Sequence, residues 1–339
     1  MDIHPHSCQF GQGNRMGGLD KYVLNRLAQL VPIVFVIIVI NFFLIHLAPG
    51  DPIVYIIGDA PVPEEMVLEL RHKYGLDQPL ITQLGIYLWD VAHGDFGYSY
   101  VARAPVLDVV LARLPATLLL TVTQYIFAIV FGIGLGVVSA RRQSWTTESA
   151  TTLISVVGYA VPVFFLGQML MLIFSFKFGL FPSQGMYSLR YDMTPLDSVL
   201  DVAWHLVLPC ITLAFFNLAL IARLTRANIL QTLRLEYLMF ARSKGISETA
   251  VLYRHALRNA ILPVVTIIGG DIKTLVTGAV LTETVFAWPG IGRLTFEALT
   301  ARDYPVLMAM FVFVGILVVL ANLVTDLAYA YLDPRIRYQ

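Results

Sequence analysis

The sequence predicts an all-α membrane protein with six transmembrane helices, a structured outer loop and a helical cytoplasmic loop. Only 14% of its 339 residues are charged, whereas a soluble domain usually carries about 25%. Hydrophobic residues make up 57% of the chain, and its mean hydropathy is +0.72. Six separate stretches are also long and apolar enough to cross a bilayer core, which needs about 20 residues per helix.

The six expected spans form one membrane domain over residues 28–331, between tails at 1–27 and 332–339. A basic segment precedes the first apolar stretch, as in a secretory signal. Because that stretch is longer than the roughly 7 to 15 apolar residues of such signals, we expect an uncleaved span. The spans run approximately over 28–48, 115–139, 150–175, 205–222, 259–285 and 305–331.

The distribution of Lys and Arg predicts the orientation of the chain. Fourteen of these residues lie in one set of segments, formed by 1–27, 140–149, 223–258 and 332–339. The other connections carry eight, of which four fall in the 66-residue loop 49–114 and are discounted because of its length. The positive-inside rule then places both termini and the 223–258 loop in the cytoplasm.

Several functional classes find no support in the sequence. The 23 Lys and Arg balance the 23 Asp and Glu, so there is no basic excess of the kind that nucleic-acid binding favours. Cys8 and Cys210 lie too far apart to suggest a disulfide or metal framework. The motifs HExxH, CxxC and GxxxxGK[ST] do not occur. We therefore expect no catalytic residues, no metal ligands and no nucleotide site on this chain.

The outer loop, residues 49–114, is predicted to contain short helices. Pro63 and Glu64 suit the first turn of one helix, where an acidic side chain favours the helix dipole. Residues 78–93 read as a second helix, and Gly94 and Gly97 follow it as turn residues.

The cytoplasmic loop 223–258 is the most informative segment, because its 36 residues exceed what two neighbouring spans need. Tyr237, Phe240 and Ala241 are spaced for one helical face, with Glu236 on the polar side. Gly245 suits a helix C-terminus and Ser247 the N-cap of a second helix; both preferences are strong. Two readings stay open: a docking knob for a partner protein, or a helix pair whose basic side faces anionic lipid headgroups.

Ionisable residues inside spans are functional candidates by default. Asp271 and Lys273 in the fifth span, and Glu283 at its outer mouth, are possible pathway-lining residues. Lys273 can also extend its amine to the nearby interface. Around Glu283, the segment with Trp288 and Gly290 predicts either a turn folded back toward the pathway or an interfacial Trp anchor.

Small residues at four-residue spacing predict close helix packing. Gly132 and Gly136 lie in the second span, and Gly270, Thr274 and Gly278 lie in the fifth. Such residues let two helix backbones approach each other, so we expect them to pack helices together first of all.

Short segments along nearly the whole chain resemble the dipeptide and oligopeptide branch of ATP-binding-cassette (ABC) importer permeases. In the cytoplasmic loop these are ARSKG at 241–245 and HALRNAILP at 255–263, where Ala241, Gly245 and Leu257 match the general signature of that loop. The others follow in the order that the family shows: NRLAQLVP at 25–32, APGDP at 48–52, HGDFGYS at 93–99, LPATLLL at 114–120, LTETVFAWPGIGRL at 281–294, RDYPV at 302–306 and DPRIR at 333–337.

The resemblance implies a division of labour among several proteins in a bacterial inner membrane. Two permease chains form the pathway, two cytoplasmic ATPase subunits bind ATP and Mg, and an external binding protein delivers the solute. This chain would bind no cofactor itself. Its loop residues Glu236, Tyr237, Phe240, Ala241, Gly245 and Leu257 would contact the ATPase. Related permeases carry dipeptides, oligopeptides, nickel complexes, glutathione or sugars.

A different class of transporter is the main alternative. A self-sufficient ion-coupled transporter would use the intramembrane residues Asp271, Lys273 and Asp326. It would transport solute without partner ATPases. No internal repeat in the sequence favours this reading.

Overall fold

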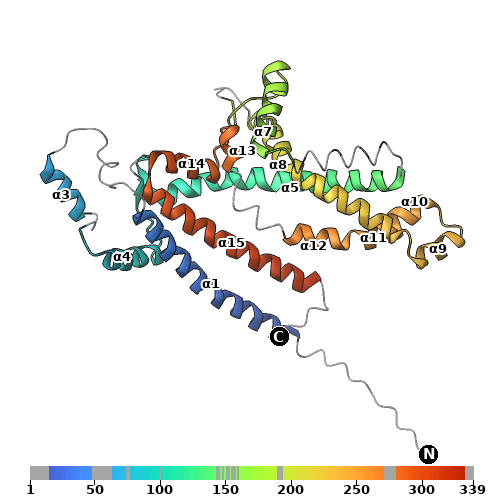
Figure 1. The fold of residues 1–339 in the computed structure, drawn as a ribbon, viewed down its shortest axis with the longest axis horizontal. Helices are drawn as coiled ribbons and strands as arrows, with labels where there is room; N and C mark the ends of the chain where they lie inside the picture. Colours follow the sequence, from blue (N-terminus) through green and yellow to red (C-terminus); the bar gives the residue numbers. More distant parts are fainter. Residues whose placement is uncertain are drawn as a thin grey trace, which may run out of the picture.

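A computed structural model of the chain shows long helices lying side by side (Figure 1). It describes residues 15–47, 63–73, 77–99, 101–142, 160–188, 194–270 and 280–332, with isolated residues between 146 and 158. The helices are α1 (Arg15–His46), α3 (Glu64–Lys73), α4 (Leu80–Ala92), α5 (Val106–Arg142), α7 (Val163–Leu170), α8 (Pro195–Thr232), α9 (Glu236–Ser243), α10 (Glu248–Ala250), α11 (Leu257–Ala260), α12 (Leu262–Gly270), α13 (Val280–Val285), α14 (Ile291–Ala301) and α15 (Tyr304–Leu332).

Two further kinds of element complete the described chain. Two π-helical segments, η1 (Met171–Lys177) and η2 (Val251–Ala256), continue helices α7 and α10. The strands β1 (Tyr98–Ser99) and β2 (Ala104–Pro105) form a short antiparallel hairpin just before α5. The expected outer-loop helices agree with α3 and α4.

Among the described residues, three helices are long and apolar enough to cross a membrane. They span Val106–Arg142, Pro195–Thr232 and Tyr304–Leu323. The first two contain the predicted second and fourth spans, and the third covers most of the predicted sixth span, 305–331. The start of the predicted third span, before residue 160 apart from isolated residues, and the middle of the fifth at 271–279 with Asp271 and Lys273, lie outside the described residues. The all-α class is confirmed, while the count of six spans stays a prediction.

The helix that contains the predicted fourth span extends beyond it at both ends, because α8 runs from Pro195 to Thr232. Arg223 and Arg226 end the apolar run, yet Arg is a good helix former and does not interrupt the backbone hydrogen bonds. At the start of α8, the Thr194 hydroxyl accepts a hydrogen bond from the Asp197 backbone N–H. In return, the Asp197 carboxylate accepts a hydrogen bond from the Thr194 backbone N–H. Such a capping box fixes the first turn.

Helices α5 and α8 form the centre of the bundle and touch through glycines. A Cβ atom placed on Gly136 would lie 2.6 Å from Thr225 Cβ and 2.7 Å from the Ala222 carbonyl oxygen. One placed on Gly132 would lie 2.9 Å from Ile221 Cβ. These distances confirm that both glycines pack helices together.

Gly136→Ala is therefore expected to destabilise the protein by about 1–3 kcal/mol through overpacking of the α5–α8 contact. Gly134→Ala is the matched control, because no atom lies within 4 Å of a Cβ at Gly134 on the same helix. Thermal unfolding of the purified variants measures the difference. Equal melting temperatures for the two variants would contradict the close contact at Gly136.

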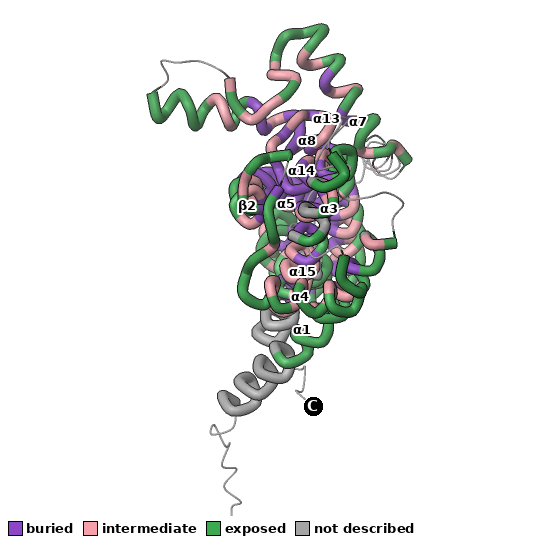
Figure 2. The backbone as a smooth tube through the Cα atoms, turned by 90° about the vertical axis from the view of Figure 1, so that its left-hand side faces the viewer, coloured by how far each residue is buried: buried purple, intermediate pink, exposed green. Residues whose placement is uncertain are grey.

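The two ends of the bundle carry different structures, and we name them accordingly. The knob end carries α9, α10, η2 and α11, and the hairpin end carries the β1–β2 hairpin, α4 and α14 (Figure 1). Buried residues concentrate where α5, α8, α13 and α14 meet, whereas α3 and α4 are largely exposed (Figure 2).

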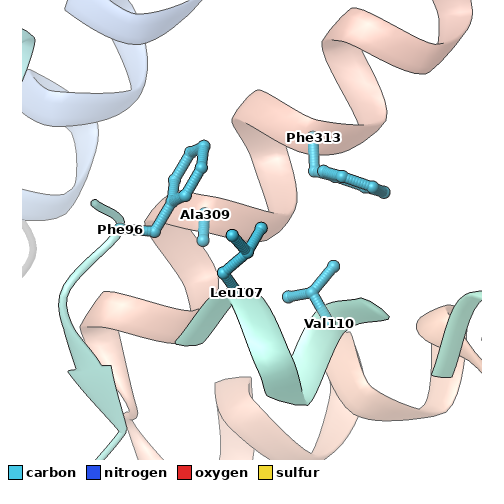
Figure 3. Close-up of a pocket in the computed structure, with 5 residues that line it drawn as sticks. All are labelled: Phe96, Leu107, Val110, Ala309 and Phe313. Carbon is cyan, nitrogen blue, oxygen red and sulfur yellow. The ribbon is translucent and has the colours of Figure 1, made fainter. Parts of the chain in front are cut away.

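At the hairpin end, the hairpin is fixed to the start of α15. The Ser99 hydroxyl donates a 2.5 Å hydrogen bond to the Asp303 carboxylate, and both residues are buried. Beside this contact lies an apolar notch between α5 and α15 (Figure 3). Its lining is entirely hydrophobic and offers nothing for recognising the polar ends of a peptide: Phe96, Leu107, Val110, Ala309 and Phe313.

Candidate functional site

The knob at the end of α8 is two short helical arms joined at a glycine, as predicted. Gly245 has a φ of +76°, and its N–H donates to the Arg242 carbonyl oxygen at 2.9 Å. The Ser247 hydroxyl accepts a hydrogen bond from the Ala250 N–H and caps the second arm. This left-handed backbone conformation explains why glycine occupies position 245, since residues with a Cβ atom rarely adopt it.

The inner side of the knob is a small apolar core of Leu238, Ala241, Val251 and Ala256. The prediction that Ala241 shares a face with Tyr237 and Phe240 is wrong. Ala241 is 8% exposed, whereas Tyr237 is 41% and Phe240 62% exposed. Leu238 and Ala241, three residues apart, form the inward stripe of α9, and the prediction missed Leu238.

The outward side of the knob presents several large apolar side chains. We call this set the apolar face of the knob: Leu235, Tyr237, Met239, Phe240 and Tyr253, all exposed. Lys244 lies with its amine 4.5 Å from the centre of the Phe240 ring, and Glu236 is also exposed at the start of α9. Exposed apolar groups gathered in this way mark a surface for a partner.

Polar contacts hold the two arms at a fixed angle. Arg242 Nε lies 2.8 Å from Glu248 Oε1, and its Nη1 donates to the carbonyl oxygen of Leu233 at 3.3 Å. Asn259 Nδ2 donates to the Tyr237 hydroxyl at 2.8 Å, which ties α9 to α11. Neither contact was predicted from the sequence, although an Arg and a Glu flank the glycine turn.

The knob is also packed onto the bundle. Leu252 of η2 and Ala260 of α11 share a buried cluster with Val137 and Ala140 of α5 and with Ile229 of α8. Leu257, predicted to contact a partner, is half-buried and packs against this cluster. A force on the knob would therefore act on the ends of both long helices.

At the hairpin end, Glu283 occupies a closed polar site. Its side chain is fully buried. Thr117 Oγ1 donates to Glu283 Oε1 at 2.8 Å, and the backbone N–H of Arg293 donates to Oε2 at 3.0 Å. The Ile291 N–H in turn donates to Thr117 Oγ1 at 2.7 Å. The carboxylate therefore caps the N-terminus of α14 and joins it to α5.

The turn after Glu283 folds back into the bundle. Trp288 is fully buried, and its indole N–H donates to the Ala116 carbonyl oxygen at 2.8 Å. Phe286 packs with Met171 and Leu208. The burial of Trp288 supports the folded-back turn over an interfacial Trp anchor, while a position of this turn near the pathway stays a prediction. The structure also gives no support to Glu283 as a pathway-lining residue, because its carboxylate is enclosed by α5 and α14.

These features define a class of protein. Long apolar helices that can cross a membrane, together with a rigid knob whose apolar side chains are exposed, define a membrane protein with a surface for a partner protein.

Comparison with known proteins identifies the family. Residues 132–338 match the family described as "Binding-protein-dependent transport system inner membrane component", and residues 19–121 match its N-terminal counterpart. The chain belongs to this family, the multi-pass inner-membrane permeases of ABC importers. This membership favours the ABC permease over the self-sufficient ion-coupled transporter.

Three relatives cover 94% of this chain and 99% of their own length. The di/tripeptide transport system permease protein DppB of Pseudomonas aeruginosa is 40% identical. Dipeptide transport system permease proteins DppB of Alkalihalophilus pseudofirmus and Escherichia coli K12 are 38% and 37% identical. Among solved structures, a chain of an amino acid ABC transporter with histidines aligns with a TM-score of 0.48 at 15% identity, covering 66% of this chain and 94% of that one. That similarity is too low to support an argument about function.

Proposed function

We propose that this chain imports dipeptides or similar short peptides as one of two permease chains. Two ATPase subunits that bind ATP and Mg would supply the energy, and an external binding protein would deliver the solute. The names of the relatives support the peptide class. The knob end lies in the cytoplasm together with both termini, an orientation that the Lys and Arg distribution supports.

The observation that carries this proposal is the apolar face of the knob on a rigid base. Tyr237 and Phe240 are exposed, while their helix is fixed by the Arg242–Glu248 contact and packed onto α5 and α8. An ATPase that binds this face and moves would move both helices. Such coupling requires that the ATPase contacts differ between its two states.

The direct test is reconstitution with and without partners. The chain is purified with a second permease and candidate ATPases, placed in liposomes, and supplied with binding protein and a dipeptide. We expect ATP hydrolysis and uptake to rise only when all components are present. Uptake by this chain alone, driven by a proton or sodium gradient, would instead establish the ion-coupled alternative.

Gly245→Ala is expected to weaken coupling because alanine must adopt a φ of +76° there. The left-handed conformation costs a residue with a Cβ atom about 1–2 kcal/mol. No atom lies within 4 Å of a Cβ at this position, so steric overlap contributes nothing. The stimulation of ATP hydrolysis by the dipeptide should fall severalfold.

Gly245→Asn is the matched control, because asparagine tolerates the left-handed conformation better than other residues with a Cβ atom. We expect it to retain more stimulation than Gly245→Ala. If both variants keep full stimulation, the glycine turn has no part in coupling.

A further inference from the structure

Helix α4 exposes a face that does not suit water. Each of its 13 residues, all of them described, is exposed or half-buried. Ile81 is 80% and Trp89 68% exposed, and Leu80 and Ile86 are exposed as well. The remaining exposed residues of the helix, Thr82, Gly85 and Ala92, carry no charge. A helix that faced water would present charged and polar side chains there.

The other side of α4 packs on the hairpin end of α1. The Tyr87 ring lies 5.9 Å from the ring of Phe42, a buried residue of α1 that also stacks on His46 at 3.9 Å. Figure 1 shows α4 beside this end of α1, away from the knob. The helix is therefore held at the level where α1 approaches the end of its apolar segment, Val31–Leu44.

Helix α1, against which α4 packs, exposes apolar side chains of its own. Phe35, Ile40 and Leu44 of α1 are exposed, and in a membrane protein such side chains face lipid or another membrane chain. At 1.5 Å per residue, α4 is only about 20 Å long and cannot cross a core of about 30 Å. An apolar helix of this length is either a buried core helix or a segment in the membrane interface, where Trp is enriched. Helix α4 has no buried residue, which favours the interface.

We infer that α4 is a membrane-surface helix, with Ile81, Ile86 and Trp89 inserted into the leaflet at the hairpin end. The exposed face carries no Lys or Arg, so the contact is to the acyl boundary and zwitterionic headgroups. Its binding should therefore not depend on anionic lipid, unlike that of a basic amphipathic helix.

The anchored helix leads directly into the segment that holds the hairpin. After α4, the Asp95 carboxylate accepts a hydrogen bond from the Gly97 N–H at 2.8 Å, and Ser99 then bonds Asp303 at the start of α15. The loop is thus fixed at one end to the lipid surface and at the other to the bundle.

Site-directed spin labelling of the assembled complex in nanodiscs tests this placement. Nitroxides are attached at Ile86→Cys, at Leu44→Cys as a lipid-facing control on α1, and at Gln78→Cys as a water-facing control just before α4. The background carries Cys8→Ser and Cys210→Ala and is first shown to transport. Collision with oxygen reports lipid, and collision with a water-soluble nickel chelate reports water.

We expect the ratio of oxygen to nickel collisions at Ile86 to equal the ratio at Leu44 and to exceed the ratio at Gln78. This result should not change when anionic lipid or binding protein is added. A ratio equal to that at Gln78 would overturn the inference. So would a label at Ile86 shielded from both reagents, which would mean contact with the second permease. Shielding that arises only when binding protein is added would instead assign the face to that protein.

Trp fluorescence gives a readout without labelled variants. Lipids brominated on their acyl chains should quench the native complex more than the Trp89→Phe complex. Identical quenching would contradict insertion of Trp89.

Discussion

Phe240→Asp is expected to abolish dipeptide-stimulated ATP hydrolysis while leaving the fold of the chain unchanged. Phe240 is 62% exposed, which makes it the most exposed side chain of the apolar face of the knob. Its loss in the free chain removes only the contact with Lys244, which is worth about 0.5–1 kcal/mol at an exposed site. In a complex, aromatic side chains of this kind are hot spots whose removal costs at least about 2 kcal/mol.

A loss of that size weakens ATPase binding by roughly thirtyfold or more, and the buried charge adds to it. Co-purification of the ATPase and the stimulated hydrolysis rate measure the effect. Thr249→Asp is the control, since Thr249 is exposed on the other arm of the knob and lies outside the apolar face. Equal losses in both variants would point to a general effect of charge and not to the apolar face.

The local features of the knob were predictable from sequence, because short-range rules decide them. Gly245 and Ser247 were assigned correctly as a helix end and a helix start. The same rules could not choose which side of α9 faces inward, since Leu238 and Phe240 are both large and apolar. That choice depends on Val251 and Ala256 in the next arm, against which Leu238 packs.

The hairpin end was harder to predict, because its contacts join distant parts of the chain. Thr117 and Glu283 are 166 residues apart, and Ser99 and Asp303 are 204 apart. Both pairs connect segments that the family resemblance had marked only as sequence matches. The length of α8 was missed for another reason: hydropathy locates the edge of a span, whereas the helix ends where its backbone hydrogen bonds end.

Glu283→Ala is expected to destabilise the chain strongly and to reduce transport. It leaves the buried Thr117 hydroxyl and the partly buried Arg293 N–H without their acceptor. Each unsatisfied donor costs about 1–3 kcal/mol, so the sum is about 2–6 kcal/mol. Glu297→Ala is the matched control: it removes an acid of α14 that pairs with Arg293 at a partly exposed site, where a pair is worth about 0–1 kcal/mol. Thermal unfolding separates the two, and equal shifts would contradict the capping role of Glu283.

Gly290 allows a second test of where the Glu283 carboxylate lies. Its φ of −102° suits any residue, so the backbone does not explain why glycine is needed. A Cβ atom at Gly290 would instead overlap the carboxylate of Glu283. Gly290→Ala should therefore destabilise the native chain by about 1–3 kcal/mol, but it should cost much less in the Glu283→Ala background, where the overlapping group is gone. A double-mutant cycle measures this coupling, which we expect within about 0.5–3 kcal/mol. Additive losses would mean that the carboxylate does not lie against Gly290.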